Sequence, residues 1–264
     1  MKAVFMGKCK RSAASALDWL VRQGCDVAAV VCAPPDAFTR PEQRLDLVAR
    51  DHGLPLASDD ELYEALADPA ASELDLGDVD VVISFLFWKR IREPLISLGR
   101  LGCLNFHPAP LPDMRGLGGY NVAILEGRRD WGVSCHFVQE TFDTGDLVAV
   151  DRFPIDPDGA TAFSLDLESQ ERLLELFVKV MQSALAGDEL PRTPQREGRY
   201  VSREELEELR RVRPGDDLER KLRAFWYPPW AGAVIELDGR TLTLVDERLL
   251  ADAAQAYREA GRIP

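Results

Sequence analysis

The stretch of sequence that decides the fold starts at residue 102, and its centre reads Asn105-Phe-His107-Pro-Ala-Pro-Leu-Pro112. It continues through Arg115-Gly116 and Val133-Ser-Cys-His136 to Asp143-Thr-Gly145-Asp146. Side chains two residues apart on an extended segment share a face, so Asn105 and His107 are expected to point the same way. The proline-dense loop after them restricts the backbone and fixes their geometry. The stretch therefore supplies an amide, an imidazole and a carboxylate to one region.

Upstream of this stretch, apolar runs alternate with segments of helical periodicity. Strands are expected at 2–6, 26–32, 80–85 and 102–106, and helices at 11–23, 42–51, 59–67 and 90–99. A near-continuous β-branched run is typical of a parallel strand that is covered on both faces. The alternation predicts an α/β protein with a Rossmann-like, mostly parallel sheet and helices on both faces.

Downstream the pattern changes. Strands are expected at 131–139 and 146–154, joined by the Asp-Thr-Gly turn, and a long amphipathic helix at 162–186. Residues 187–216 are charged and punctuated by Pro and Gly, which indicates a linker with one short helix at 203–210. A helix at 216–224 and a hairpin that turns at Asp238-Gly239 complete the chain. We therefore expect a catalytic domain at 1–188, and a linker with a small helix and β-hairpin subdomain at 189–264.

The composition argues against several classes of partner. The net charge is −13 and the pI is near 4.8, whereas a nucleic-acid-binding face is normally basic. No stretch approaches the roughly 18 to 20 consecutive apolar residues of a membrane helix. The N-terminus runs straight into a strand and lacks a cleavable signal pattern. We expect a cytoplasmic protein that binds neither nucleic acid nor membrane.

The cysteines point to a reducing compartment. Their number is odd, their spacing does not match a metal site, and they lie mostly in apolar runs, at positions 9, 25, 32, 103 and 135. This pattern is typical of buried free thiols, and no bound metal is expected.

The residue types in the opening stretch suggest acyl transfer. Ligands of an open α/β sheet collect at the carboxyl ends of its strands, where Asn105 and His107 are expected. An amide can donate to an oxyanion, and an imidazole titrates near neutrality. Taken singly, Asn105 could be a turn residue and His107 a packed ring. Together with Asp143 they are the parts needed to move an acyl group onto an amine without a metal or a covalent enzyme intermediate.

These residues resemble the motif of the formyltransferases that use 10-formyltetrahydrofolate, namely Asn-x-His-Pro-Ser-Leu-Leu-Pro-x-x-Arg-Gly, then Val-Thr-x-His, then Asp-x-Gly-x-Ile. The resemblance covers about residues 1–185 and departs at Ala109 and Pro110, where Ser and Leu are common. The matching positions are Asn105, His107, Pro108, Leu111, Pro112, Arg115, Gly116, Val133, His136, Asp143, Gly145 and Leu147.

The resemblance implies a formyltransferase fold, 10-formyltetrahydrofolate as co-substrate, and roles for particular residues. It implies that Asn105, His107 and Asp143 are catalytic, and that His136 supports the site structurally or catalytically. It also implies that Arg115 positions the loop or contacts the substrate. The folate is expected to lie along an apolar slot whose binding residues are Ser84, Phe85, Leu86, Phe87, Gly145 and Asp146.

The acceptor amine is the open question. The tail Arg223-Ala-Phe225-Trp-Tyr-Pro-Pro-Trp230 is similar to that of the sugar N-formyltransferases, which favours a nucleotide-linked amino sugar. Trp226 and Tyr227 then either line the acceptor site or pack the appendage, and the hairpin is a possible homodimer interface. A methionyl-tRNA formyltransferase-like enzyme resembles the fold but carries a longer, basic C-terminal barrel. A formyltransferase for another small amine (a hydroxyornithine or an antibiotic precursor) is a third candidate, and a folate-binding, deformylase-like relative is a fourth.

A basic segment, Lys8-Cys-Lys10-Arg11, follows the first strand in this acidic chain. It lies at the carboxyl end of that strand, near the expected site. We expect Lys8, Lys10 or Arg11 to meet a phosphate or carboxylate of a substrate; the competing interpretation is a solvated helix start.

Overall fold

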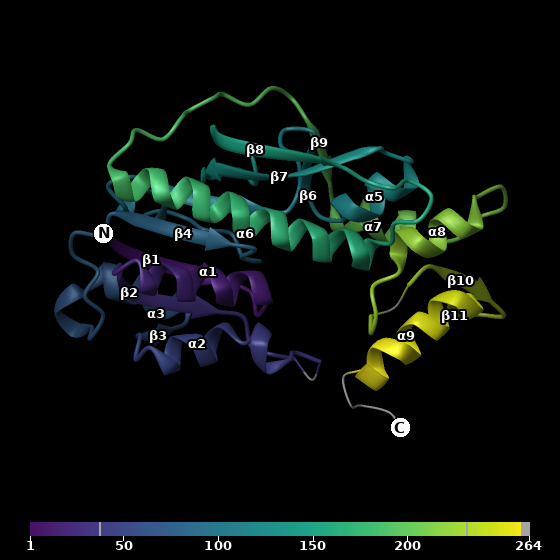
Figure 1. The fold of residues 1–264 in the computed structure, drawn as a ribbon, viewed down its shortest axis with the longest axis horizontal. Helices are drawn as coiled ribbons and strands as arrows, with labels where there is room; N and C mark the ends of the chain where they lie inside the picture. Colours follow the sequence, from purple (N-terminus) through teal and green to yellow (C-terminus); the bar gives the residue numbers. More distant parts are fainter. Residues whose placement is uncertain (37, 231, 260–264) are drawn as a thin grey trace. The chain divides into compact units, whose positions relative to one another are not determined.

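The computed structural model describes residues 1–36, 38–230 and 232–259 (Figure 1). Two compact units are present, and each is assembled from separate segments of the sequence. Unit 1 comprises Met1–Arg115, Gly132–Arg152 and Ser169–Arg199; unit 2 comprises Gly116–Trp131, Phe153–Glu168 and the described residues from Tyr200 onward. The expected domain boundary at residue 188 stays a prediction. Residues 231 and 260–264 of the expected subdomain lie outside the described residues.

A seven-stranded sheet forms from the described part of the chain, in the order β3-β2-β1-β4-β5-β7-β8. Neighbours from β3 to β5 pair in parallel, whereas β5 and β7 pair antiparallel. The expected α/β fold with a mostly parallel sheet is therefore confirmed. The strands are β1 Lys2–Gly7, β2 Asp26–Cys32, β3 Leu56–Ala57, β4 Val81–Phe85, β5 Cys103–His107, β7 Asp130–Phe137 and β8 Leu147–Pro154.

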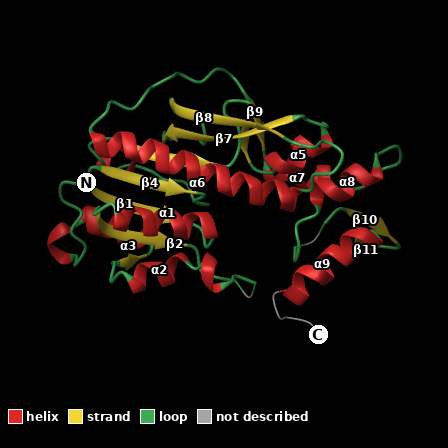
Figure 2. Ribbon diagram, viewed as in Figure 1, coloured by secondary structure: helices red, strands yellow, loops and turns green. Residues whose placement is uncertain are grey.

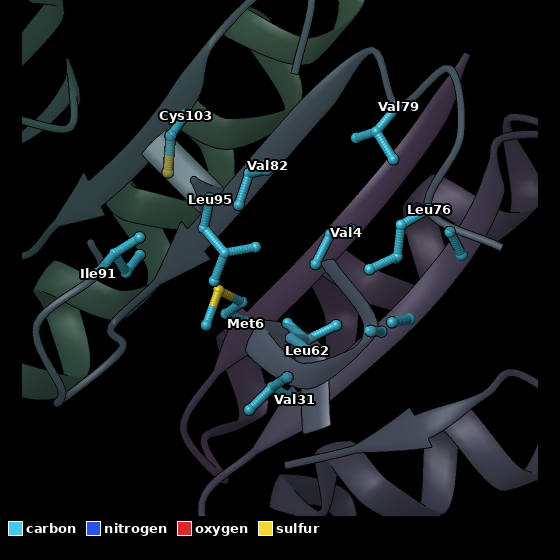
Figure 3. Packing of buried hydrophobic residues seen from close by; sticks show 13 residues of the cluster. Val4, Met6, Val31, Leu62, Leu76, Val79, Val82, Ile91, Leu95 and Cys103 are labelled. Atoms are coloured by element: carbon cyan, nitrogen blue, oxygen red, sulfur yellow. The ribbon is translucent and has the colours of Figure 1, made fainter. Parts of the chain in front are cut away.

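Alternate residues of a strand point to opposite faces of the sheet, and here both sets are apolar and buried. Helices therefore cover both faces of this sheet. Figure 3 shows one face, where Val4 and Met6 of β1 pack with Leu62 of a helix. On the other face Phe5 lies against Phe177 in an edge-to-face pair, with ring centroids 6.5 Å apart. The helices associated with the sheet are α1 Arg11–Arg22, α2 Leu45–Asp51, α3 Asp59–Ala67, α4 Leu95–Leu98 and α6 Ala162–Ala186.

Several local features differ from the expectation. The helix expected at 90–99 begins only at Leu95, with Pro94 as its N-cap. A residue that precedes proline is disfavoured in the helical region, so the helix cannot include Glu93. Periodicity also did not predict the short strands β6 Met114–Gly116 and β9 Arg199–Val201, which pair with each other. Three residues are too few to establish a period of two.

Unit 2 contains α5 Gly119–Leu125, α7 Arg203–Arg210, α8 Leu218–Phe225, the hairpin β10 Val234–Leu237 with β11 Arg240–Thr243, and α9 Glu247–Glu259 (Figure 2). The hairpin turns at Asp238-Gly239 as expected, and both residues have positive φ, 49° and 73°. Such angles are those of the tight turn that suits strand twist. Helix α9 was not predicted. Its Leu249 is buried in a cluster with Leu222 and Phe225 of α8, which anchors the end of the described chain.

Candidate active site

Strand register places three polar side chains next to one another. Ser84 of β4 is opposite Asn105 of β5 in the parallel pair, and Asn105 is opposite His136 of β7 in the antiparallel pair. Side chains that are directly opposite on neighbouring strands lie on the same face within contact distance. Asn105 and His107 were expected at this strand end, but the row across three strands follows only from the strand pairing.

Hydrogen bonds fix the Asn105 amide on both sides. The Ser84 hydroxyl donates to Asn105 Oδ1 over 2.7 Å, and Asn105 Nδ2 lies 2.9 Å from His136 Nε2. His136 Nδ1 lies 2.8 Å from the Phe137 carbonyl oxygen, which only accepts. Nδ1 therefore carries the proton of the neutral ring, and Nε2 accepts from the amide. The outcome is a chain of buried contacts that fixes both the orientation of the amide and the tautomer of His136.

Asp143 meets both imidazoles. Its Oδ1 lies 3.6 Å from His107 Nδ1 and 3.6 Å from His136 Nε2, in the turn between β7 and β8. The turn is tight, because Asp143 has a φ of 54°, and Phe137 N–H donates to the Asp146 carbonyl oxygen over 2.9 Å. A Cβ atom at Gly145 would lie 1.8 Å from Phe137 O, so only glycine fits there.

His107 is held as a neutral base. Its Nε2 lies 3.3 Å from the Met114 carbonyl oxygen, so the ring proton belongs on Nε2 and the lone pair of Nδ1 faces Asp143. Burial lowers the pKa of His107 below its ordinary value of 6.5, and the Asp143 charge only partly opposes this. At neutral pH the imidazole is thus unprotonated and able to accept a proton.

A second layer, which the sequence analysis did not predict, supports the Asp143 turn. Gln195 Nε2 donates to the Gly145 carbonyl oxygen over 2.6 Å. Arg115 donates in turn to Gln195 Oε1 over 3.0 Å and to the Arg196 carbonyl oxygen over 2.7 Å. The Arg192 guanidinium lies 3.5 Å from the centroid of the Phe137 ring. The expected loop-positioning role of Arg115 therefore has a physical basis, which is a link from its loop to the turn through Gln195.

The formyl transferase family model matches residues 1–181. The chain belongs to this family. A methionyl-tRNA formyltransferase of Novosphingobium aromaticivorans is 30% identical over 261 residues, which cover 97% of this chain and 84% of that protein.

Solved structures show the same fold in other formyltransferases. This formyltransferase is similar to a 4-N formyltransferase from Francisella tularensis, with a TM-score of 0.73, 18% identity, and coverage of 93% of this chain and 97% of that one. It is also similar to an N-formyltransferase from Helicobacter canadensis solved with folinic acid and dTDP-3-aminofucose, with a TM-score of 0.68, 16% identity, and coverage of 90% and 85%. At these identities the likeness concerns the fold, and the relatives differ in the acceptor that their names indicate.

The segment expected to meet the folate combines core and loop residues in this formyltransferase. The Phe85 ring is fully buried and stacks between Phe5 and Phe106, so any contact with a ligand would involve its backbone. Leu86 has a φ of 57°, and its N–H donates to Phe106 O over 3.3 Å. Phe87 is partly buried and touches Trp88. The Ser84 hydroxyl donates to Asn105, and its expected contact with the folate stays a prediction.

The other expected substrate residues are placed as follows. Lys8 is exposed and Lys10 is half-buried as the N-cap of α1, directly after β1. Trp226 and Tyr227 belong to unit 2 and pack with its hydrophobic cluster. The Tyr227 hydroxyl donates a short hydrogen bond to buried Asp166, so this phenol has a structural partner.

Within 1–36, 38–230 and 232–259, no group of three or more His, Cys, Asp and Glu side chains is arranged to hold a metal ion. Over the same ranges, no helix combines the length and apolar character needed to cross a membrane.

Proposed function

We propose that this formyltransferase moves the formyl group of 10-formyltetrahydrofolate onto the amine of a nucleotide-linked amino sugar. The observation that carries the proposal is the cluster of Asn105, His107 and Asp143 in a chain of the formyl transferase family. In the reaction a C–N bond forms between the acceptor amine and the formyl carbon. The bond from that carbon to the folate nitrogen breaks, and one proton passes from the amine to the folate nitrogen.

Asn105 is proposed as the oxyanion donor. The amide nitrogen has two N–H bonds, and the contact with His136 uses one of them. The second can donate to the formyl oxygen as negative charge develops there during attack by the amine. The contacts with Ser84 and His136 hold the amide before the substrate binds, which is what makes such a donor effective.

His107 and Asp143 are proposed to carry the proton. The N–H groups of both imidazoles point to backbone carbonyl oxygens, and the lone pair of His136 Nε2 accepts from the Asn105 amide. The lone pair of His107 Nδ1 faces Asp143 Oδ1, so a proton taken from the attacking amine is accommodated between these two acceptors. Because His107 is neutral at neutral pH, it can accept this proton before the leaving folate nitrogen receives it.

The folate is proposed to contact the backbone of Ser84 to Phe87, at the end of β4 and just beyond it, and the turn at Gly145 and Asp146. The register of β4 with β5 supports this position, because it places the end of β4 beside Asn105. Lys8 and Lys10, which follow β1, are proposed to bind a phosphate or carboxylate of a substrate.

An amino-sugar acceptor is supported by three observations. The chain has a net charge of −13, which opposes binding to tRNA phosphates. Its fold matches nearly the whole length of the Francisella enzyme, and the Helicobacter enzyme was solved with dTDP-3-aminofucose. The tail from Arg223 to Trp230 resembles the sugar enzymes. We further propose that the enzyme is cytoplasmic and forms a homodimer. We also propose that its catalytic domain ends at residue 188 and that the linker and small subdomain begin at residue 189.

Methionyl-tRNA is the second candidate acceptor, because the Novosphingobium relative bears that name at 30% identity. The two candidates are distinguished by incubating the purified enzyme and 10-formyltetrahydrofolate with either dTDP-linked amino sugars or methionyl-tRNA. Product mass and kcat/KM are then measured. We expect formylated amino sugar and little formylated tRNA. Formylation of the tRNA with no amino sugar consumed would reverse the assignment.

A further inference from the structure

Two cysteines lie together at the ends of neighbouring strands. Gly7 of β1 pairs with Cys32 of β2, and Ala33 N–H donates to Gly7 O over 3.1 Å. Two residues after Gly7, Cys9 Sγ lies 3.3 Å from the Ala33 carbonyl oxygen. The Cys9 thiol donates to this oxygen, so its side chain folds back onto the peptide that follows Cys32, and Cys9 and Cys32 lie near each other.

The surroundings favour a thiolate on Cys9. The Cys32 thiol, the backbone of Leu45 and the positive charge of the Arg44 guanidinium each lower the pKa of Cys9. Burial and Asp46 act against the thiolate, although Asp46 is itself paired with Arg44 over 2.5 Å. The balance lowers the pKa of Cys9 from its ordinary value of 9.0 to about 7, and the contact with Cys9 raises the pKa of Cys32.

The remaining cysteines provide an internal contrast. All five thiols are free, but Cys25, Cys103 and Cys135 are buried, whereas Cys9 and Cys32 are only half-buried. Burial also raises the pKa of each of the three buried thiols. The expectation of buried thiols thus holds for three positions and fails at Cys9 and Cys32, because Cys9 lies beyond the end of β1 and Cys32 is the last residue of β2.

We propose that Cys9 and Cys32 are a reactive dithiol that is converted to an intramolecular disulfide by exchange with a low-molecular-weight disulfide. The Cys9 thiolate attacks one sulfur of that reagent and expels one thiolate, which leaves a mixed disulfide on Cys9. The Cys32 thiol then loses its proton, attacks the Cys9 sulfur and expels the second thiolate. Two protein thiols are oxidised, and one small disulfide is reduced to two thiols.

The test is exchange with glutathione disulfide on the full-length protein at neutral pH. After remaining thiols are alkylated under denaturing conditions, peptide mass mapping should find Cys9 linked to Cys32 and the other three cysteines alkylated. Cys32→Ala should instead retain glutathione on Cys9, whereas the control Cys25→Ala should form the same disulfide as the wild type. Wild-type protein with no Cys9–Cys32 link, or with Cys9 modified no faster than Cys25, would overturn the proposal.

The pH dependence of alkylation is an independent measurement. The rate of Cys9 alkylation by iodoacetamide should be half-maximal near pH 7, since the thiolate is the nucleophile. Cys32→Ala removes a donor and should move the midpoint upward, whereas Cys32→Ser keeps a hydroxyl donor and should move it less. A wild-type midpoint near the ordinary value of 9.0 would contradict the dithiol.

Discussion

The strand-end cluster of unit 1 and the hairpin of unit 2 are built on different physical principles. In the cluster, Ser84 and His136 are 3% and 2% exposed, and each contacts Asn105 directly. In the hairpin, every residue of β11 is exposed. A buried network has one low-energy arrangement because each unpaired polar group would be costly, whereas an exposed strand tolerates change. We infer that the chemistry depends on the cluster, and that acceptor choice belongs to less buried elements.

Asp143→Asn is expected to have the largest effect on the cluster. The amide keeps the shape of the side chain but removes the charge that faces His107 and His136, so the proton that His107 accepts is no longer stabilised by a carboxylate. We expect kcat to decrease by ~100- to 10,000-fold, the usual range for a positioned acid or base. Steady-state kinetics and circular dichroism measure the loss and the fold. Full turnover in a folded Asp143→Asn protein would remove this residue from the mechanism.

Asn105→Ala removes the proposed oxyanion donor, and Ser84→Ala removes a hydrogen bond that holds this donor. We expect the first substitution to have the larger effect on kcat. Loss of an oxyanion donor typically lowers kcat by ~100- to 1000-fold, so we expect that range for Asn105→Ala. Ser84→Ala removes one hydrogen bond to the amide and should lower kcat about fivefold, the equivalent of roughly 1 kcal/mol. The comparison of kcat with the KM for folate decides the role of Ser84. A change in KM alone would mean that Ser84 contacts folate, as the sequence analysis expected.

Gln195→Ala should have a smaller effect, which is mainly a decrease in kcat. The substitution removes the contact with the Gly145 carbonyl oxygen and loosens the turn that carries Asp143. We expect a loss of kcat within about tenfold, because the remaining turn contacts persist. The matched control is Glu197→Ala, an exposed position in the same segment. Equal effects of the two substitutions would show that Gln195 has no specific role.

The pH dependence of activity should follow His107. Because burial lowers its pKa, the base form persists below pH 6.5, and kcat/KM should decrease only as the pH falls through that lowered pKa. In Asp143→Asn the attraction of the carboxylate is lost, so NMR titration of His107 should show a still lower pKa. The free energy of unfolding should also decrease as the pH falls below 6.5, because the unfolded chain binds this proton more readily than the folded chain does. An acid limb above pH 6.5 would exclude His107 as the titrating base.

The sequence predicted the fold well where elements are long and periodic. The helix at 162–186 and the hairpin turn at Asp238-Gly239 are confirmed, because each has a strong local signal. The row formed by Ser84, Asn105 and His136 was not predicted as a row, since strand register is a property of pairing and not of local pattern. The contact of Gln195 with Gly145 spans 50 residues and has no local signal. Strand register and contacts between residues far apart in the sequence can be identified only in the folded chain.

The most direct test of the central claim is formyl transfer by His107→Ala. The variant should bind 10-formyltetrahydrofolate with nearly wild-type affinity, because the folate is proposed to contact the β4 end and the Asp143 turn. In single-turnover reactions with a dTDP-linked amino sugar, the rate of formylation should decrease by ~100-fold or more. A folded His107→Ala protein that formylates the acceptor at the wild-type rate would contradict the account.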